Sequence, residues 1–352
     1  MTNTLFNILH FLTGPVRAGM IMLVVFSIVQ FLSCDEKKSQ IVKVAGTAQG
    51  TTYHITYISA ANIDYKTELD SILKKIDSSL STYLPVSIIS RINNNDSNVV
   101  VDKYFTDVFE EALRISAKTA GLFDVTVAPL VNTYGFGFTK KGLIDSSSID
   151  SLLQFVGYEM VKIENGKVIK AKPQVMLDFN AIAQGYTVDV LATFLETKKI
   201  ENYLVELGGE VKAKGKKNKN EFWKIGIDKP NENPGEGRLL QAVVDLRDKA
   251  LATSGNYRKF YVENGKKYAH IIDPRTGYPV KHNLLSATVI ADNCMTADAY
   301  ATAFMVMGLE RSRQFLSTHQ EIQLEVYFIF EENGKWKTFN SATLNDWIEH
   351  VH

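Results

Sequence analysis

The start of the chain alternates apolar and polar residues, which is the pattern of strands that bury one face. The stretch "VKVAGTAQGTTYHITYI", residues 42–58, alternates on both sides of Gly50 and predicts two strands joined by a turn there. Residues 67–80 instead repeat apolar side chains at the spacing of an amphipathic helix. Two further helices are predicted over residues 106–120 and from about Ala181 to Thr197.

The tetrapeptide "ENGK" occurs three times, at residues 164–167, 263–266 and 332–335, each time between strand-like segments. Asn-Gly favours a tight hairpin because both residues tolerate positive φ. Three hairpins mixed irregularly with helices predict an α+β fold, with mixed but largely antiparallel sheets and packed helices. The repeated motif also suggests an internal duplication. We expect one folded domain over residues 45–352.

Composition narrows the class of protein. The 352 residues are 45% hydrophobic, and 39 basic side chains balance 39 acidic ones. A protein without a strongly basic domain is not expected to bind nucleic acid, which leaves an enzyme or a small-molecule binding protein. Residues 212–224 are the one basic patch, and we interpret them as the solvated tip of a hairpin rather than a docking surface for an acidic partner.

The N-terminus has the features of an export signal. Residues 1–33 contain no acidic side chain, and their apolar run ends in "FLSC", followed by "DEKK". This resembles the lipobox of bacterial lipoproteins, in which the cysteine, here Cys34, is lipidated. We predict a signal peptide over residues 1–33, a polar tether over 34–44, and a lipid anchor in a bacterial membrane, facing the periplasm or the exterior. An uncleaved anchor or a misassigned start is the alternative. Cys294 is then expected to be a small buried residue.

The segment "NCMTADAYATAFMVMG", residues 293–308, reads as a buried helix that carries two polar side chains. Asp298 and Thr302 are four residues apart, so they point from the same face. In "MLDFNAIAQGYTVD", residues 176–189, we expect a strand to end at Asp178 and Asn180 to cap the following helix. The free N–H groups at such a helix start suit a phosphate, although simple capping explains the pattern equally well.

Other stretches place polar residues where a plain core has no need of them. Tyr83 lies in a polar turn, where an aromatic ring can stack on a flat ligand or simply pack. Asp124 beside Thr126 must bond to something polar, protein or ligand. Gly208-Gly209 fits a bulge or a close ligand approach. His270 precedes the turn "DPRTG" and is expected to share a strand face with Ile272.

In this order the motifs closely resemble those of the ApbE family, the FAD:protein FMN transferases. The resemblance spans roughly residues 45–310 and rests on "STY", "FDVTVAPLVNTYGFG", "LDFNAIAQGYTVD", "VELGGE", "ATSGNYRKFY", "HIIDPRTGYPV" and "TADAYAT". It implies an exported enzyme that cleaves FAD with Mg²⁺, attaches FMN to a threonine or serine hydroxyl of a target protein and releases AMP. Exported electron-transfer subunits are the targets that the resemblance suggests.

The resemblance also implies roles for individual residues. Asp298, Thr302 and the carbonyl of Ala181 are expected to bind Mg²⁺, which prefers such hard oxygens. Tyr83 is expected to stack on the isoalloxazine ring. The remaining FAD contacts that it implies are Asp124, Val125, Thr126, Asp178, Gln184 and Ile272.

Two positions depart from the family pattern. Gln184 stands where lysine or glutamate is expected, and Gln49 replaces the methionine of an early "MGT".

We assign His270 as the base that takes the proton of the acceptor hydroxyl, because imidazole titrates near neutral pH.

Two alternatives stay open. With water as the acceptor, the protein is a Mg²⁺-dependent FAD pyrophosphatase that yields FMN and AMP. Without chemistry, it is a flavin-binding lipoprotein, although a flavin carrier has no need of the Asp298 and Thr302 pair.

Overall fold

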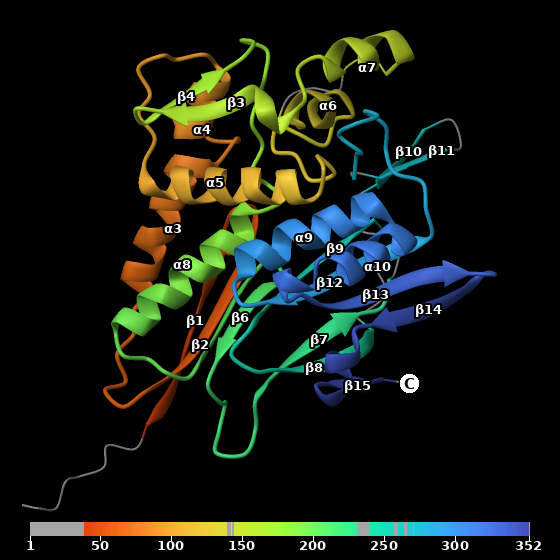
Figure 1. The fold of residues 1–352 in the computed structure, drawn as a ribbon. Helices are drawn as coiled ribbons and strands as arrows, with labels where there is room; N and C mark the ends of the chain where they lie inside the picture. The colour runs from red at the N-terminus through yellow and green to blue at the C-terminus, as the bar shows by residue number, and fades with distance from the viewer. Residues whose placement is uncertain are drawn as a thin grey trace, which may run out of the picture. The chain divides into compact units, whose positions relative to one another are not determined.

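A sheet of eight strands runs through the part of the chain that this computed structural model describes, which comprises residues 39–138, 142, 144–230, 239–256, 260–263, 266–269 and 271–351 (Figure 1). The neighbours from β2 to β14 pair antiparallel. The strand order is β1 (Gln40–Ala48), β2 (Thr51–Ser59), β5 (Tyr203–Leu207), β6 (Glu210–Lys214), β9 (Ala250–Gly255), β12 (Leu284–Ala291), β13 (Glu325–Glu332) and β14 (Lys335–Asn340).

Helices cover one face of this sheet and a smaller sheet covers the other (Figure 1). Alternate residues of β9 and β12 enter different apolar clusters, as the two-residue period of a strand requires. Ala252 and Val289 pack with the helices, whereas Leu251 and Ile290 pack with the small sheet. That sheet consists of β15 (Ile348–His350), β8 (Leu240–Leu246) and β7 (Trp223–Asp228).

Two helices lie directly on the main sheet. Helix α8 contacts β5 and β6, and helix α9 contacts β9 and β12 as well as α8. The helices named with their bounds are α3 (Lys66–Leu80), α4 (Ile88–Asn93), α5 (Lys103–Lys118), α6 (Ala128–Thr133), α7 (Ser146–Leu153), α8 (Ala183–Thr197), α9 (Cys294–Met307) and α10 (Leu309–Thr318).

The predicted helices and strands of the first half are confirmed, with shifts at their ends. Helix α5 begins at Lys103, before the predicted start, because the side chain of Asp102 accepts a hydrogen bond from the N–H of Phe105 at 2.9 Å. Strand β1 begins at Gln40, so residues 40–44 of the predicted tether are strand.

All three "ENGK" motifs connect paired strands, as predicted. They join β3 (Val161–Glu164) to β4 (Lys167–Lys170), β10 (Phe260–Glu263) to β11 (Lys266–Ala269), and β13 to β14. In the first and last turns both Asn and Gly have positive φ, between 50° and 73°. The three hairpins lie in three different sheets. The first and last motifs therefore share a turn type, and the internal duplication stays a prediction.

The basic segment is exposed, but its interpretation as a hairpin tip is wrong. Residues 216–221 are solvent-exposed, yet β6 belongs to the main sheet and β7 to the small one. The segment therefore crosses from one sheet to the other.

The predicted signal peptide, residues 1–33, and the predicted lipidation site, Cys34, lie outside the described residues. Within the described ranges, no helix combines the length and the apolar character needed to cross a bilayer.

Candidate functional site

The start of α8 and the first turns of α9 touch at Gly185. A Cβ atom on this glycine would lie 2.4 Å from the carbonyl oxygen of Cys294 and 2.8 Å from Cβ of Asp298. Such distances are shorter than any real contact, so only glycine allows the two helices to meet here. The group that approaches the backbone of Gly185 so closely is α9.

This contact gives Asp298 a backbone partner. The N–H of Gly185 donates to Oδ2 of Asp298 at 3.0 Å, instead of to the carbonyl of Ala181 one turn earlier. Among the described residues, no N–H donates to that carbonyl. The carbonyl of Ala181, just before the start of α8, therefore keeps its lone pairs available, and the carboxylate of Asp298 bonds to the backbone four residues further on.

Asp298 is a buried carboxylate without a positive partner among the described residues. Its side chain is 6% exposed, and Gly185 is its one hydrogen-bond donor in that part of the chain. Burial raises the pKa of Asp298 to about 7. A charge in such a place is costly, and a bound cation would favour its ionised form.

Thr302 adds a neutral oxygen one turn further along α9. Its Oγ1 lies 3.1 Å from Oγ of Ser254 on β9. A hydroxyl that donates to a neighbouring hydroxyl keeps lone pairs for another partner. The sequence alone could not pair Ser254 with Thr302, because nothing local relates β9 to α9.

These oxygens fit Mg²⁺ better than a softer metal. No group of three or more His, Cys, Asp or Glu side chains gathers within the described ranges. Asp298, Thr302 and the Ala181 carbonyl form a set of hard oxygens with a single charge. Mg²⁺ is commonly bound by one or two carboxylates and keeps its other positions for water and phosphate oxygens. The donor set therefore suits Mg²⁺ shared with a phosphate-bearing ligand.

Tyr83 and Asp178 meet beside the start of α8. Burial and the charge of Asp178 raise the pKa of Tyr83, while a hydrogen bond from the side chain of Asn180 lowers it. Burial also raises the pKa of Asp178, which accepts the N–H of Asn180 at 2.7 Å. Tyr83 is nevertheless 64% exposed. An exposed ring beside the buried Asp178 is free to stack on a flat ligand.

Two predictions about this segment are wrong. Asn180 does not cap α8: the helix begins at Ala183, and Ile182 precedes it without a side-chain cap. The backbone of Asn180 is instead held by Asp178, which forms a local turn. The strand expected to end at Asp178 is reduced to a single bridge between Met176 and Val127.

The side chains of Asp124 and Thr126 bond to protein groups. Asp124 Oδ1 accepts the N–H of Thr126 at 2.8 Å and its hydroxyl at 2.6 Å, and Oδ2 accepts the N–H of Tyr158 at 2.7 Å. Thr126 in turn accepts the N–H of Gly157 at 2.7 Å. The carbonyl of Val125 accepts the N–H of Asp178 at 2.8 Å. The segment thus supports the Asp178 turn, and its direct contact with a ligand stays a prediction.

Gln184 lies against the turn between β5 and β6. Gly208 and Gly209 form this turn with φ of 68° and 116°, so they are a hairpin turn and not a bulge. A Cβ on Gly208 would lie 3.1 Å from Nε2 of Gln184. Gln49 Nε2 donates to Thr187 Oγ1 at 2.8 Å, in a turn that borders a cavity of about 510 Å³. Both family departures therefore lie beside the first turns of α8.

The remaining predicted residues lie near the "DPRTG" turn. The turn is confirmed, since Gly277 N–H donates to the carbonyl of Asp273 at 2.9 Å. Ile272 is 5% exposed and packs with Leu130 and Ile149 in an apolar cluster. Its contact with a ligand stays a prediction, and His270 lies outside the described residues.

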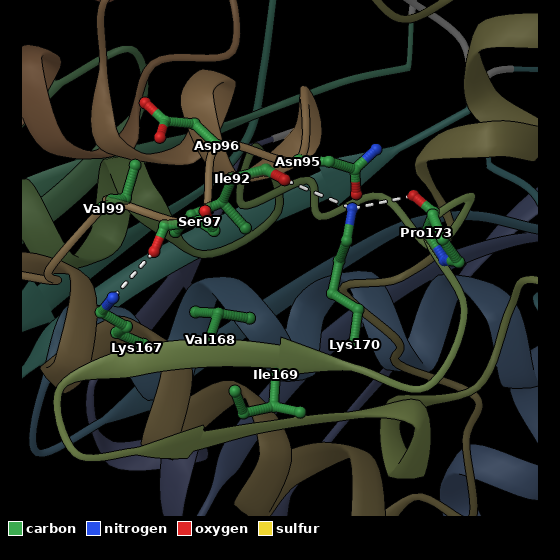
Figure 2. A pocket seen from close by; sticks show the side chains of 10 residues that line it. All are labelled: Ile92, Asn95, Asp96, Ser97, Val99, Lys167, Val168, Ile169, Lys170 and Pro173. Atoms are coloured by element: carbon green, nitrogen blue, oxygen red, sulfur yellow. Dashed lines mark hydrogen bonds between the residues drawn. The ribbon is translucent and has the colours of Figure 1, made fainter.

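A separate cavity of about 440 Å³ lies between the β3–β4 hairpin and the loop that follows α4 (Figure 2). Its lysines hold the hairpin in place: Lys170 Nζ bonds the carbonyls of Ile92 and Pro173 at 3.3 and 2.9 Å, and Lys167 Nζ bonds that of Ser97 at 2.8 Å. The lining carboxylate, Asp96, pairs with an arginine at 2.7 Å. The lining carboxylate and both lysines are therefore already paired, and the contact between α8 and α9 is the stronger candidate site.

Comparison with known proteins identifies the family of this chain. The family model described as "ApbE family" matches residues 49–328. The chain belongs to the ApbE family. The FAD:protein FMN transferase of Haemophilus influenzae is 36% identical to it over 332 residues, which cover 90% of this chain and 94% of that protein.

Solved ApbE structures agree with this assignment. The flavin transferase ApbE from Vibrio cholerae superposes with a TM-score of 0.78 at 35% identity, covering 88% of this chain and 99% of that one. The apo form of the Pseudomonas stutzeri flavinyl transferase ApbE gives a TM-score of 0.77 at 28% identity, covering 88% and 97%. The predicted family and the predicted α+β class are confirmed.

Proposed function

We propose that this ApbE family member is a Mg²⁺-dependent FAD:protein FMN transferase that modifies a threonine or serine of an exported protein. The observation that carries the proposal is the buried Asp298 carboxylate, which is held against the start of α8 by the N–H of Gly185, four residues after the free carbonyl of Ala181. Relatives named FAD:protein FMN transferase support the reaction type.

The chain supplies three oxygens for the metal. Asp298 provides the charge, and Thr302 and Ala181 provide neutral oxygens, so most positions stay open to water and phosphate. The chemistry that bound Mg²⁺ supplies is neutralisation of negative charge on the pyrophosphate. Oγ of Ser254 lies 3.1 Å from the hydroxyl of Thr302 and helps to hold that oxygen in place.

In the proposed reaction the acceptor oxygen bonds to the phosphorus of the FMN half of FAD. The bond from that phosphorus to the bridging oxygen breaks, and AMP leaves with the electron pair. We assign His270 to take the proton of the acceptor hydroxyl.

The decisive experiment supplies FAD, Mg²⁺ and candidate exported electron-transfer proteins, and then reads flavin fluorescence in a denaturing gel together with free AMP. A fluorescent acceptor band with equimolar AMP is the expected result. AMP without a labelled protein would instead establish the FAD pyrophosphatase, and the absence of both products would leave a flavin-binding lipoprotein.

Tyr83→Ala is expected to weaken FAD binding by about 1–3 kcal/mol, the scale of stacking between an aromatic side chain and a nucleic-acid base. That corresponds to a roughly 5- to 160-fold higher Kd. Tyr83→Phe is the matched control and should bind FAD almost normally, because it keeps the ring. Calorimetric titration of both variants with FAD decides the point. Equal losses in the two variants would assign the effect to the hydroxyl, which bonds with Asn180.

We further propose that the protein is exported and anchored through lipid on Cys34, since an apolar run ends at that cysteine. Cys34→Ala should release the protein into the soluble fraction or block removal of the signal peptide. Membrane fractionation and the mass of the mature N-terminus test this. Unchanged processing and membrane association in the variant would exclude the lipobox.

A further inference from the structure

Both carboxylate oxygens of Asp189 on α8 accept hydrogen bonds from the first turn of α9. Oδ1 accepts the N–H of Cys294 at 3.0 Å, and Oδ2 accepts the N–H of Met295 at 2.9 Å. Lys212 on β6 places its Nζ 2.8 Å from Oδ1. The Asp189 side chain is 15% exposed, so water competes weakly for these bonds.

These bonds complete the N-terminus of α9. The first N–H groups of a helix have no partner within it. The side chain of Asn293 caps α9 by accepting the N–H of Thr296 at 2.8 Å. Asp189 satisfies the two preceding N–H groups, and its negative charge suits the positive end of the helix dipole. The cap of α9 therefore has two parts, Asn293 at the start of α9 itself and Asp189 on α8.

Asp189 and Gly185 act on the same interface. They are four residues apart on α8, so they lie on one face of it. Gly185 donates to Asp298, and Asp189 holds Met295, three residues before Asp298 in α9. Together the two contacts fix the rotation of α9 about its own axis and its position along α8. That placement sets where the Asp298 carboxylate lies relative to the carbonyl of Ala181.

We infer that Asp189 is a positioning residue for the metal site: by capping α9 from α8 it holds the Asp298 carboxylate in place against the start of α8, where it would bind Mg²⁺. The inference rests on the proposed function, which assigns the metal to these oxygens. Asp189 itself does not touch the metal. Its loss should weaken metal binding more than it changes the reaction once the metal is bound.

The chain offers a matched control on the same two elements. Glu196 on α8 pairs with Lys214 on β6 at 3.0 Å and accepts the hydroxyl of Tyr203 at 2.8 Å. Both acids therefore join α8 to a lysine of β6, yet Glu196 has no bond to α9 among the described residues. Glu196→Gln removes the charge of an ion pair between α8 and β6 without touching α9.

The test measures Mn²⁺ binding to the FAD-free protein by electron paramagnetic resonance, alongside melting temperature in metal-free buffer. Asp189→Asn keeps the size of the side chain but replaces one acceptor oxygen with a donor. We expect a Kd for Mn²⁺ raised about 10-fold, the lower end for groups that support metal ligands. Glu196→Gln should bind Mn²⁺ as the wild type does. In turnover assays Asp189→Asn should need more Mg²⁺ for half-maximal rate while keeping most of its kcat.

Wild-type Mn²⁺ affinity in a folded Asp189→Asn protein would overturn the inference, as would an equal loss in Glu196→Gln. Should Asp189→Asn fail to fold, Asp189→Glu carries the same test, because it keeps the charge but displaces both oxygens. Asp298→Ala is measured in the same series. If it loses Mn²⁺ binding while Asp189→Asn does not, the inference alone is wrong. If Asp298→Ala binds like the wild type, the metal site of the proposed function is wrong and the inference falls with it.

Discussion

Asp298→Ala is expected to abolish Mg²⁺-dependent release of AMP from FAD while the protein stays folded. Asp298 is the single carboxylate of the proposed donor set, so its removal leaves two neutral oxygens, too weak to hold Mg²⁺ at millimolar concentration. The fold should survive, because the main structural loss is one bond to the N–H of Gly185, and leaving such a group unpaired costs about 1–3 kcal/mol.

The variant Asp298→Asn distinguishes the loss of metal binding from the loss of protein stability. The amide oxygen can still accept the N–H of Gly185, so stability should return towards that of the wild type while turnover stays lost. Thr302→Ala should be milder than either, because water can replace a neutral ligand. AMP measured by chromatography and unfolding followed by circular dichroism give both quantities. Wild-type AMP release by Asp298→Ala would show that the metal lies elsewhere.

His270→Asn is expected to lower flavin transfer about 10²–10⁴-fold, the usual cost of losing a general base. His270 is not among the proposed metal ligands, so FAD and Mg²⁺ should still bind and extra Mg²⁺ should not restore the rate. Higher pH should restore part of it, since more of the acceptor hydroxyl is then ionised. Single-turnover transfer to a threonine-bearing target measures the effect.

The control for His270 is made on the same preparation. If the histidine merely packs beside the "DPRTG" turn, the variant will lose FAD affinity and melting temperature together, and transfer per bound FAD will be unchanged. Comparing affinity, melting temperature and transfer rate therefore separates the two roles. Normal transfer with lowered stability would contradict the catalytic assignment.

Local sequence predicted those parts of the fold that local interactions determine. The "ENGK" turns depend on adjacent residues with positive φ, and the helix over residues 67–80 depends on its own apolar spacing. The pair of Asp298 and Thr302 was likewise visible because both residues belong to one helix. Each of these features is contained within a single turn or helix, so no knowledge of distant contacts was needed.

The errors came from partners that are distant in the sequence. Asparagine is a common helix cap, but the N–H of Asn180 donates to the side chain of Asp178, and the helix begins three residues later, at Ala183. Asp124 was correctly expected to form hydrogen bonds, although its partner Tyr158 could not be foreseen across a separation of 34 residues. Asp189 stood in a motif already singled out, yet its bonds to α9 cross 105 and 106 residues. Long-range pairing of this kind has no local pattern.

The thiol of Cys294 can report how often this site opens. The carbonyl of the same residue is the group that requires glycine at position 185. Cys294 is the free cysteine of the described ranges, its side chain is fully buried, and burial raises the pKa of its thiol. Thiol reagents attack the thiolate of an accessible cysteine, so they should label Cys294 only when the structure packed around it opens. The labelling rate of Cys294 then measures how often that opening occurs. A ligand that binds across α8 and α9 should lower this rate.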